Sequence, residues 1–204
     1  MEIKKDKDRR IGLTTWQTLV IGGIITVFAV VFSYTTAWGL HIDHMEEAAS
    51  AKIFQGKEYA TVQGDTFSTA DLKNTTVTAV NVWATTCHGC IEEMPALEAV
   101  SNSYDQSQFR IISIPDDVTD ADGNVKSAEL ETAKQIITEK GVTFPSLILD
   151  KESYSFIKAN VSSTPTTFFV DSSGNIIDTR LGDNTYDGWK SDIDAILASV
   201  QQQD

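Results

Sequence analysis

The spacing of hydrophobic and polar positions changes several times along the chain, and each spacing predicts a different element. Residues 77–83 are almost all apolar or β-branched, which is typical of a strand buried on both faces. Residues 87–104 repeat their apolar positions at helical spacing, with Pro95 inside the helix, where we expect a kink. Ser127 is expected to cap a second helix over residues 128–140.

The rest of the chain also divides into segments with the apolar pattern of strands and segments with that of helices. Further strands are predicted at residues 59–62, 66–68, 109–114, 146–150, 166–171 and 176–181. Further helices are predicted at residues 41–54, 152–160 and 186–200, and a short turn capped by Thr69 or Ser68 ends near Lys73. Strands that alternate with helices and end in a hairpin and a helix predict an α/β sandwich with a mixed central sheet.

One segment near the start is apolar throughout and predicts a membrane anchor. Residues 16–37 contain no charged side chain, and a helix of twenty-two residues can cross a hydrocarbon core of about 30 Å. Five basic residues precede this segment, and no Lys or Arg follows it before Lys52. The positive-inside rule therefore predicts a cytoplasmic N-terminus and an extracytoplasmic C-terminal part.

These boundaries divide the chain into four expected parts. Residues 1–13 form a cytoplasmic basic tail, 14–38 a transmembrane helix, 39–56 a juxtamembrane stalk and 57–204 an extracytoplasmic domain. A cleaved signal peptide is the alternative, because Thr35-Thr36-Ala37 resembles a small-residue cleavage site. The apolar segment is longer than a usual signal-peptide core of about 7–15 residues, which favours an uncleaved anchor.

Charge narrows the range of partners. The chain carries a formal net charge of −13, and its first ten residues hold five basic and three acidic side chains, so the remainder carries −15. A domain this acidic is not expected to bind nucleic acid, because the phosphates would repel it. The surplus of carboxylates indicates solubility, with a mild bias toward basic partners.

The chain contains only two cysteines, Cys87 and Cys90, between a predicted strand and a predicted helix. This C-x-x-C arrangement is typical of a thioredoxin-type redox pair, because a helix N-terminus stabilises the thiolate that attacks a disulfide. A zinc site needs about four ligands, and a c-type haem needs His at position 91, which is Ile. A structural disulfide is the remaining alternative, although so tight a loop removes little chain entropy.

Two stretches of the sequence resemble one family. Residues 81–95 (NVWATTCHGCIEEMP) are similar to the active-site stretch of membrane-anchored thioredoxin-like proteins of the TlpA/ResA type. Residues 163–171 (STPTTFFVD) resemble the cis-proline strand of these proteins, and residues 174–177 their closing hairpin. The resemblance spans about residues 59–200, and it implies a thioredoxin-like three-layer sandwich with an N-terminal hairpin.

The resemblance also implies roles for single residues. Cys87 corresponds to the exposed attacking thiol and Cys90 to the buried resolving thiol. Pro165 corresponds to the cis-proline that faces the disulfide, and Thr164 before it offers backbone groups to a bound substrate. Glu93 matches the acidic residue that these reductases carry near the site.

Some positions depart from the pattern. Asn81 stands where thioredoxin itself has a buried Asp, so Glu93 is the better candidate for handling protons. Thr86 replaces the usual Trp, and His88-Gly89 replaces the usual X-Pro. The reduction potential and the substrate specificity of the family therefore cannot be transferred to this chain. The expected substrate-docking residues are Trp83, Thr86, His88, Thr164 and Pro165.

The function that the resemblance implies is reduction of extracytoplasmic protein disulfides, with electrons supplied by a membrane protein of the DsbD/CcdA type. No cofactor other than the Cys87–Cys90 disulfide is expected, and no metal. An oxidase of protein thiols would use the same residues and is one alternative. A copper-binding chaperone is another, although those proteins typically use C-x-x-x-C with a distal His, and no His follows residue 88.

Overall fold

The computed structural model describes residues 53–202, which hold the predicted redox domain except for its last two residues. The predicted anchor at residues 14–38 and most of the predicted stalk at 39–56 lie outside the described residues. Among residues 53–202, no helix combines the length and the apolar character that a membrane span requires.

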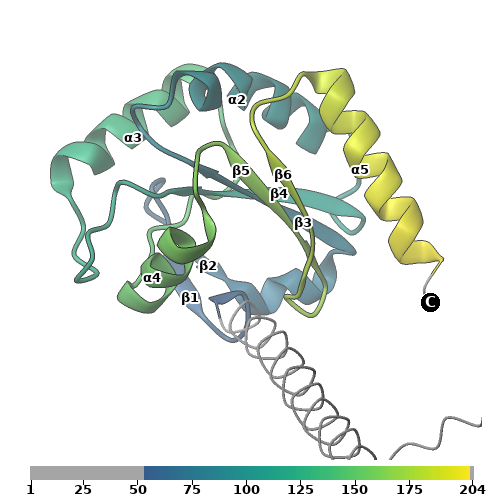
Figure 1. The fold of residues 1–204 in the computed structure, drawn as a ribbon, viewed down its shortest axis with the longest axis horizontal. Helices are drawn as coiled ribbons and strands as arrows, with labels where there is room; N and C mark the ends of the chain where they lie inside the picture. Colours follow the sequence, from purple (N-terminus) through teal and green to yellow (C-terminus); the bar gives the residue numbers. More distant parts are fainter. Residues whose placement is uncertain (1–52, 203–204) are drawn as a thin grey trace, which may run out of the picture. The chain divides into compact units, whose positions relative to one another are not determined.

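The predicted alternation of strands and helices is present in this described range (Figure 1). The strands are β1 (Glu58–Ala60), β2 (Thr66–Ser68), β3 (Val77–Trp83), β4 (Phe109–Pro115), β5 (Thr166–Asp171) and β6 (Ile176–Leu181). The helices are the 3-10 helix η1 (Thr69–Asn74), α2 (His88–Ser101), α3 (Ser127–Lys140), α4 (Lys151–Asn160) and α5 (Tyr186–Gln201). β1 and β2 form the predicted hairpin as a separate two-stranded sheet.

β3 is a central strand of the main sheet, whose order is β4-β3-β5-β6. β4 runs parallel to β3, whereas β5 and β6 continue the sheet in antiparallel fashion, so the predicted mixed sheet is confirmed. Helix α2 connects the parallel pair, because parallel neighbours need a crossover connection. β5 therefore starts beside the end of β3, where Val82 pairs with Thr166.

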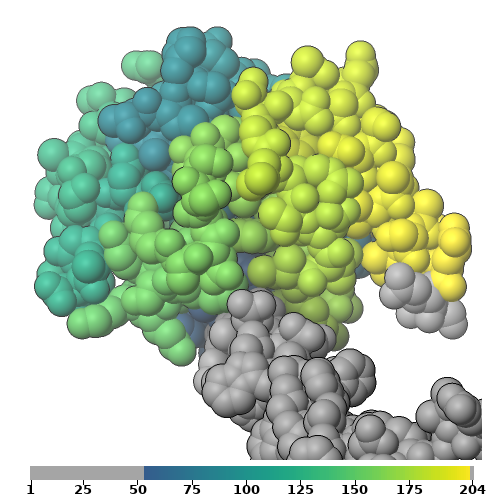
Figure 2. Space-filling view, viewed as in Figure 1, coloured from purple at the N-terminus to yellow at the C-terminus, as the bar shows by residue number. Residues whose placement is uncertain are grey.

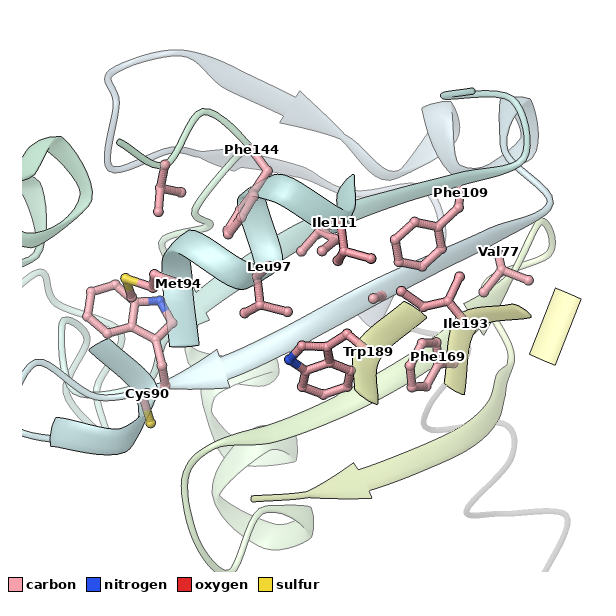
Figure 3. Close-up of a cluster of buried hydrophobic side chains, with 14 of the residues drawn as sticks. Val77, Cys90, Met94, Leu97, Phe109, Ile111, Phe144, Phe169, Trp189 and Ile193 are labelled. Atoms are coloured by element: carbon pink, nitrogen blue, oxygen red, sulfur yellow. The ribbon is translucent and has the colours of Figure 1, made fainter. Parts of the chain in front are cut away.

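Both faces of β3 are buried, because its alternating side chains belong to two separate cores. Val77, Ala79 and Trp83 point into a first core with side chains of α2, α3 and α5 (Figure 3). Val80 and Val82 point into a second core with α4 and the β1–β2 hairpin. The main sheet thus lies between two layers, as the predicted α/β sandwich requires.

The strand predicted at residues 146–150 does not form. Ser146 makes a single parallel bridge to Ser113 of β4, whereas Leu147 makes a single antiparallel bridge to Thr61. Because successive residues pair with different partners, this segment crosses from the main sheet to the hairpin instead of extending either ladder. Leu147 and Leu149 are both buried, so apolar residues alternate here as they do in a strand, although the segment is not paired as one.

Helix α2 begins as the sequence predicts, and α3 does not. Cys87 is the N-cap of α2, and the helix continues through Pro95. The predicted cap at Ser127 is wrong, because Lys126 is the N-cap of α3 and no side chain caps this helix. The carbonyl oxygen of Lys126 accepts a hydrogen bond from Leu130 N at 2.9 Å, so the helical turn already includes Ser127.

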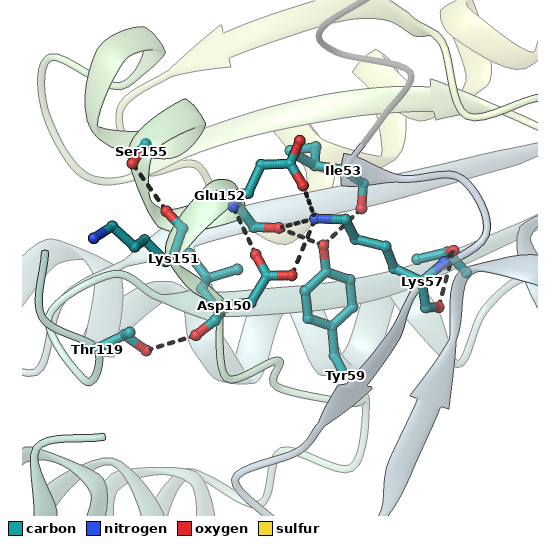
Figure 4. Close-up of polar contacts among 11 residues, drawn as sticks. Ile53, Lys57, Tyr59, Thr119, Asp150, Lys151, Glu152 and Ser155 are labelled. Atoms are coloured by element: carbon teal, nitrogen blue, oxygen red, sulfur yellow. Dashed lines mark hydrogen bonds and ion pairs between the residues drawn. The ribbon is translucent and has the colours of Figure 1, made fainter. Parts of the chain in front are cut away.

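The first described residues pack into the domain. Ile53 and Phe54, at the end of the predicted stalk, are each 2% exposed and belong to the second core. Close by, Lys57 Nζ donates to Asp150 Oδ2 at 3.0 Å and to Glu152 Oε2 at 2.8 Å, at the start of α4 (Figure 4). We call Lys57, Asp150 and Glu152 the Lys57 cluster; it joins the start of the described chain to α4.

Candidate active site

The two cysteines lie in the first turn of α2, just beyond the end of β3. Their sulfurs form a disulfide of 2.07 Å, and Cys87 Sγ accepts a hydrogen bond from Cys90 N at 3.3 Å. Cys87 is partly exposed, whereas Cys90 is fully buried in the first core (Figure 3). Of the two sulfurs, only that of Cys87 is therefore accessible to another protein.

The start of β5 lies against this disulfide. The Thr164–Pro165 peptide bond is cis, as predicted, and Thr164 O lies 3.6 Å from Cys87 Sγ. This approach is a contact rather than a hydrogen bond, because a disulfide sulfur carries no proton to donate. The antiparallel pairing of β3 and β5 places both groups at the same edge of the sheet. The docking role of Thr164 and Pro165 stays a prediction.

Glu93, one helical turn beyond Cys90, is a buried carboxylate with neutral partners. It is 4% exposed. Its Oε1 accepts from Asn81 Nδ2 at 3.2 Å, and its Oε2 accepts from Asn184 N at 3.1 Å and Trp189 Nε1 at 3.2 Å. We call these four residues the Glu93 centre.

Burial decides the protonation of Glu93. The loss of water outweighs the three hydrogen bonds and raises the pKa of Glu93 to about 7. The charge of Asp183 adds a smaller upward contribution to this pKa. A carboxyl group that titrates near neutral pH is suited to accept and return a proton.

Glu92, the preceding residue on α2, has the opposite environment. Its side chain is exposed, and its Oε1 accepts a hydrogen bond from Lys140 Nζ at 2.9 Å. This bond to a cation lowers the pKa of Glu92. The helix therefore directs one carboxylate into the core and its neighbour into solvent.

The sequence did not identify the partners of Glu93. Asn81 Nδ2 also donates to Thr167 Oγ1 at 3.0 Å, which links the centre to β5. Asn184 contributes a backbone N–H, for which a sequence holds no signal. Trp189 lies in the helix predicted at residues 186–200, and its position alone does not indicate which acceptor its buried indole N–H finds.

The other predicted docking residues occupy different environments. Thr86 and His88 are exposed beside Cys87, as a docking surface requires. Trp83, in contrast, is 0% exposed and belongs to the first core, and its docking role stays a prediction. Residue 83 is the last residue of β3, and its side chain follows the inward alternation of Val77 and Ala79.

Asp117 holds the loop that precedes Cys87, a contact that sequence reasoning also missed. Its Oδ2 accepts from Thr85 N at 2.9 Å and from Thr85 Oγ1 at 2.6 Å. Asp117 lies two residues beyond the end of β4, which is parallel to β3, so the two loops leave the sheet at the same edge.

The mixed sheet, the disulfide at a helix N-terminus and the adjacent cis-proline define a thioredoxin-like protein with a redox-active cysteine pair. Solved structures agree on the fold. A thiol:disulfide interchange protein of the thioredoxin family from Chlorobium tepidum TLS superposes with a TM-score of 0.56 at 24% identity, covering 69% of this chain and 92% of that one. A DsbF homologue from Corynebacterium diphtheriae gives a TM-score of 0.54 at 21% identity, covering 68% and 83%.

The family follows from the sequence comparison. Residues 47–197 match the Redoxin family, and the chain belongs to this family. The thioredoxin-like protein YneN of Bacillus subtilis (strain 168) is 30% identical over 174 residues, which cover 81% of this chain and 91% of YneN. The thiol-disulfide oxidoreductase ResA of Bacillus thuringiensis (strain Al Hakam) is 27% identical over 124 residues, 61% of this chain and 65% of ResA. The chain is a thioredoxin-like thiol–disulfide oxidoreductase, as predicted.

Proposed function

We propose that this chain is a membrane-tethered, extracytoplasmic enzyme that reduces protein disulfides through Cys87 and Cys90. The observation that carries the proposal is the combination of a partly exposed Cys87 at a helix N-terminus with the buried Glu93, whose pKa is about 7. The similarity to ResA, a thiol-disulfide oxidoreductase by name, supports the same class of reaction.

The reaction proceeds by two exchanges. The Cys87 thiolate attacks one sulfur of the substrate disulfide, which forms a mixed disulfide and releases the other substrate sulfur as a thiolate. Glu93 then accepts the proton of Cys90, and the Cys90 thiolate attacks Cys87. The second substrate sulfur leaves, and the Cys87–Cys90 disulfide remains. Two electrons pass to the substrate, and its two thiolates take up two protons.

The carboxylate of Glu93 favours the reducing direction. A dithiol is a strong oxidant in its disulfide form when the reduced thiolate is stabilised, as in DsbA. A negative charge one helical turn from Cys90 destabilises a nearby thiolate instead, which makes the dithiol a better reductant. A dithiol of a DsbD/CcdA-type membrane protein would then regenerate the reduced pair by the reverse exchange.

The proposed location rests on the sequence. The uncharged residues 16–37 and the basic residues before them support a cytoplasmic N-terminus and an external redox domain. In intact cells that produce the reduced full-length chain, a membrane-impermeant thiol reagent should label Cys87. Labelling that occurs only after lysis would contradict this orientation.

Trapping tests the assignment of the two cysteines. Cys90→Ser should accumulate mixed disulfides with substrate proteins, because no resolving thiol remains. Cys87→Ser should accumulate none, since the attacking sulfur is gone. Non-reducing electrophoresis with mass spectrometry measures both, and equal trapping by the two variants would contradict the assignment.

The reduction potential of the Cys87–Cys90 pair tests the direction. A potential near or below that of thioredoxin, about −270 mV, supports a reductase. A potential near that of DsbA, about −120 mV, would identify the chain as an oxidase of protein thiols and overturn the proposed direction.

A further inference from the structure

The loop between β6 and α5 is joined to both sides of the redox site. Gly182 N donates to Pro165 O at 2.9 Å, and Asn184 N donates to Glu93 Oε2 at 3.1 Å. Asp183 lies between these two anchored residues, so its position beside the disulfide is fixed by the backbone. The surface of this segment adjoins that of α2 in the space-filling view (Figure 2).

The carboxylate of Asp183 borders the C-x-x-C turn. A Cβ placed on Gly89 would lie 3.4 Å from Asp183 Oδ1, which is an ordinary contact distance. Asp183 is exposed, and within residues 53–202 its carboxylate has no hydrogen bond or ion pair. Arg180, three residues earlier, is already paired with Asp178 and Asp192. A negative charge at the rim of the site is therefore left without a counter-ion in this part of the chain.

An apolar side chain lies on the other side of Gly182. Leu181 is 69% exposed and is the last residue of β6. It pairs with Thr166, directly after Pro165, so it borders the same docking edge as Thr164. Single exposed leucines are common on protein surfaces, and the position of this one beside the reactive sulfur distinguishes it.

We propose that Asp183 and Leu181 determine substrate specificity at this site, and that they select an extended segment whose cysteine has a basic residue on one side and an apolar residue on the other. The inference rests on the proposed disulfide exchange at Cys87 and names its substrate class. Side chains of an extended segment are spaced by about 3.3 Å per residue along the backbone. A substrate cysteine held at Cys87 therefore brings its close neighbours over the β6–α5 loop.

Charge complementarity supports a basic neighbour. The chain carries a net charge of −13, so its field attracts cationic segments before contact. At contact, Asp183 offers an unpaired carboxylate, and a Lys or Arg of the substrate supplies the missing cation. The same cation also stabilises the thiolate that the substrate releases.

Single-turnover reduction of peptide disulfides tests this inference. The reduced full-length chain in neutral detergent is mixed with disulfide-linked peptides that differ only in the residue next to cysteine, which is Lys, Gln or Glu. The Lys peptide should react about tenfold faster than the Glu peptide at low salt, and the ratio should shrink in 0.5 M NaCl. Asp183→Asn should lower the ratio several-fold and leave only the part due to the net charge of the chain, whereas the exposed Asp187→Asn on α5 makes the same change in net charge and should largely preserve the ratio.

A second peptide pair, with Leu or Ser on the other side of cysteine, tests Leu181. Leu181→Ala should remove a preference of a few fold for Leu, and the matched change Ile177→Ala, on the same side of β6, should not. Equal rates for the Lys, Gln and Glu peptides in the wild type, or an unchanged ratio in Asp183→Asn, would overturn the inference while leaving the oxidoreductase intact. Failure to reduce any peptide would instead overturn the proposed reaction, and the inference with it.

Discussion

The Glu93 centre holds a buried ionisable side chain and the Lys57 cluster a partly buried one, on opposite faces of the main sheet, and their surroundings differ. Lys57, 19% exposed at its side chain, contacts two carboxylates. Glu93 contacts three neutral donors and, within residues 53–202, no cation. A compensated charge stabilises the fold, whereas an uncompensated acid changes its protonation at neutral pH and is available for chemistry.

The two regions should therefore respond differently to pH. Burial lowers the pKa of Lys57, but the bonds to Glu152 and Asp150 outweigh it, so this pKa is raised. Burial raises the pKa of Asp150, but its hydrogen bonds with Ser153 and Lys57 lower it overall. The cluster thus stabilises the fold above the unfolded pKa of Asp, about 3.9, and below that of Lys, about 10.4. Between these two pH values the raised pKa of Glu93 has the opposite effect, because deprotonation of the buried carboxyl lowers the stability of the fold.

The largest expected effect is the pH dependence of stability at Glu93. In the unfolded chain Glu93 loses its proton around pH 4.5, and in the fold it keeps the proton to about pH 7. Stability should therefore fall as pH rises, by about 3 kcal/mol between pH 4 and pH 8. Urea unfolding of the oxidised chain measures this slope, and Glu93→Gln should lack it, because Gln keeps the shape without titrating.

A matched variant makes this test specific. Glu92→Gln removes an exposed carboxylate from the adjacent position and should retain the wild-type slope. If Glu93→Gln and the wild type lose the same free energy of unfolding between pH 4 and pH 8, Glu93 does not carry an uncompensated charge.

The next effect concerns the thiols. A carboxylate near a thiolate repels it, so Glu93→Gln should lower the apparent thiol pKa of the reduced chain by up to about one unit. Thiolate absorbance or the pH dependence of alkylation measures this shift. Glu92→Gln should have a much smaller effect, and titration curves that overlay for all three proteins would exclude a role of Glu93 in the exchange.

The smallest expected effect is at the Lys57 cluster. Lys57→Met should lower the free energy of unfolding by about 1 kcal/mol, because it leaves Asp150 and Glu152 without their cation. The loss should be equal at pH 5.5 and pH 8, with no change in thiol pKa. Lys151→Met, in an exposed pair with Asp122, should cost almost nothing. If Lys57→Met instead lost a different free energy of unfolding at the two pH values, the proposed difference between the Lys57 cluster and the Glu93 centre would be wrong.

The sequence predicted those parts of the site that depend on local pattern. The strand before Cys87, the helix that follows Cys87 and the cis bond at Pro165 are predicted from spacing and from family resemblance, and the structure has all three. Two of the three partners of Glu93 could not be predicted, because they are a backbone amide and an indole more than ninety residues away. The strand predicted at residues 146–150 does not form for a similar reason. The spacing of apolar residues indicates which side chains are buried, but it does not indicate which strand a segment pairs with.

The burial of Ile53 and Phe54 has a consequence for the order in which the chain acquires its structure. The side chain of the neighbouring Gln55 bonds to Ser173 O, and a Cβ on Gly174 would lie 3.0 Å from Phe54 O. Gly174, which lies against the backbone of Phe54 on the turn between β5 and β6, emerges from the ribosome about 120 residues after it. During synthesis the contacts of this segment with the turn can form only after the last hairpin has been made. The start of the domain is therefore among the last parts to acquire all of its native contacts.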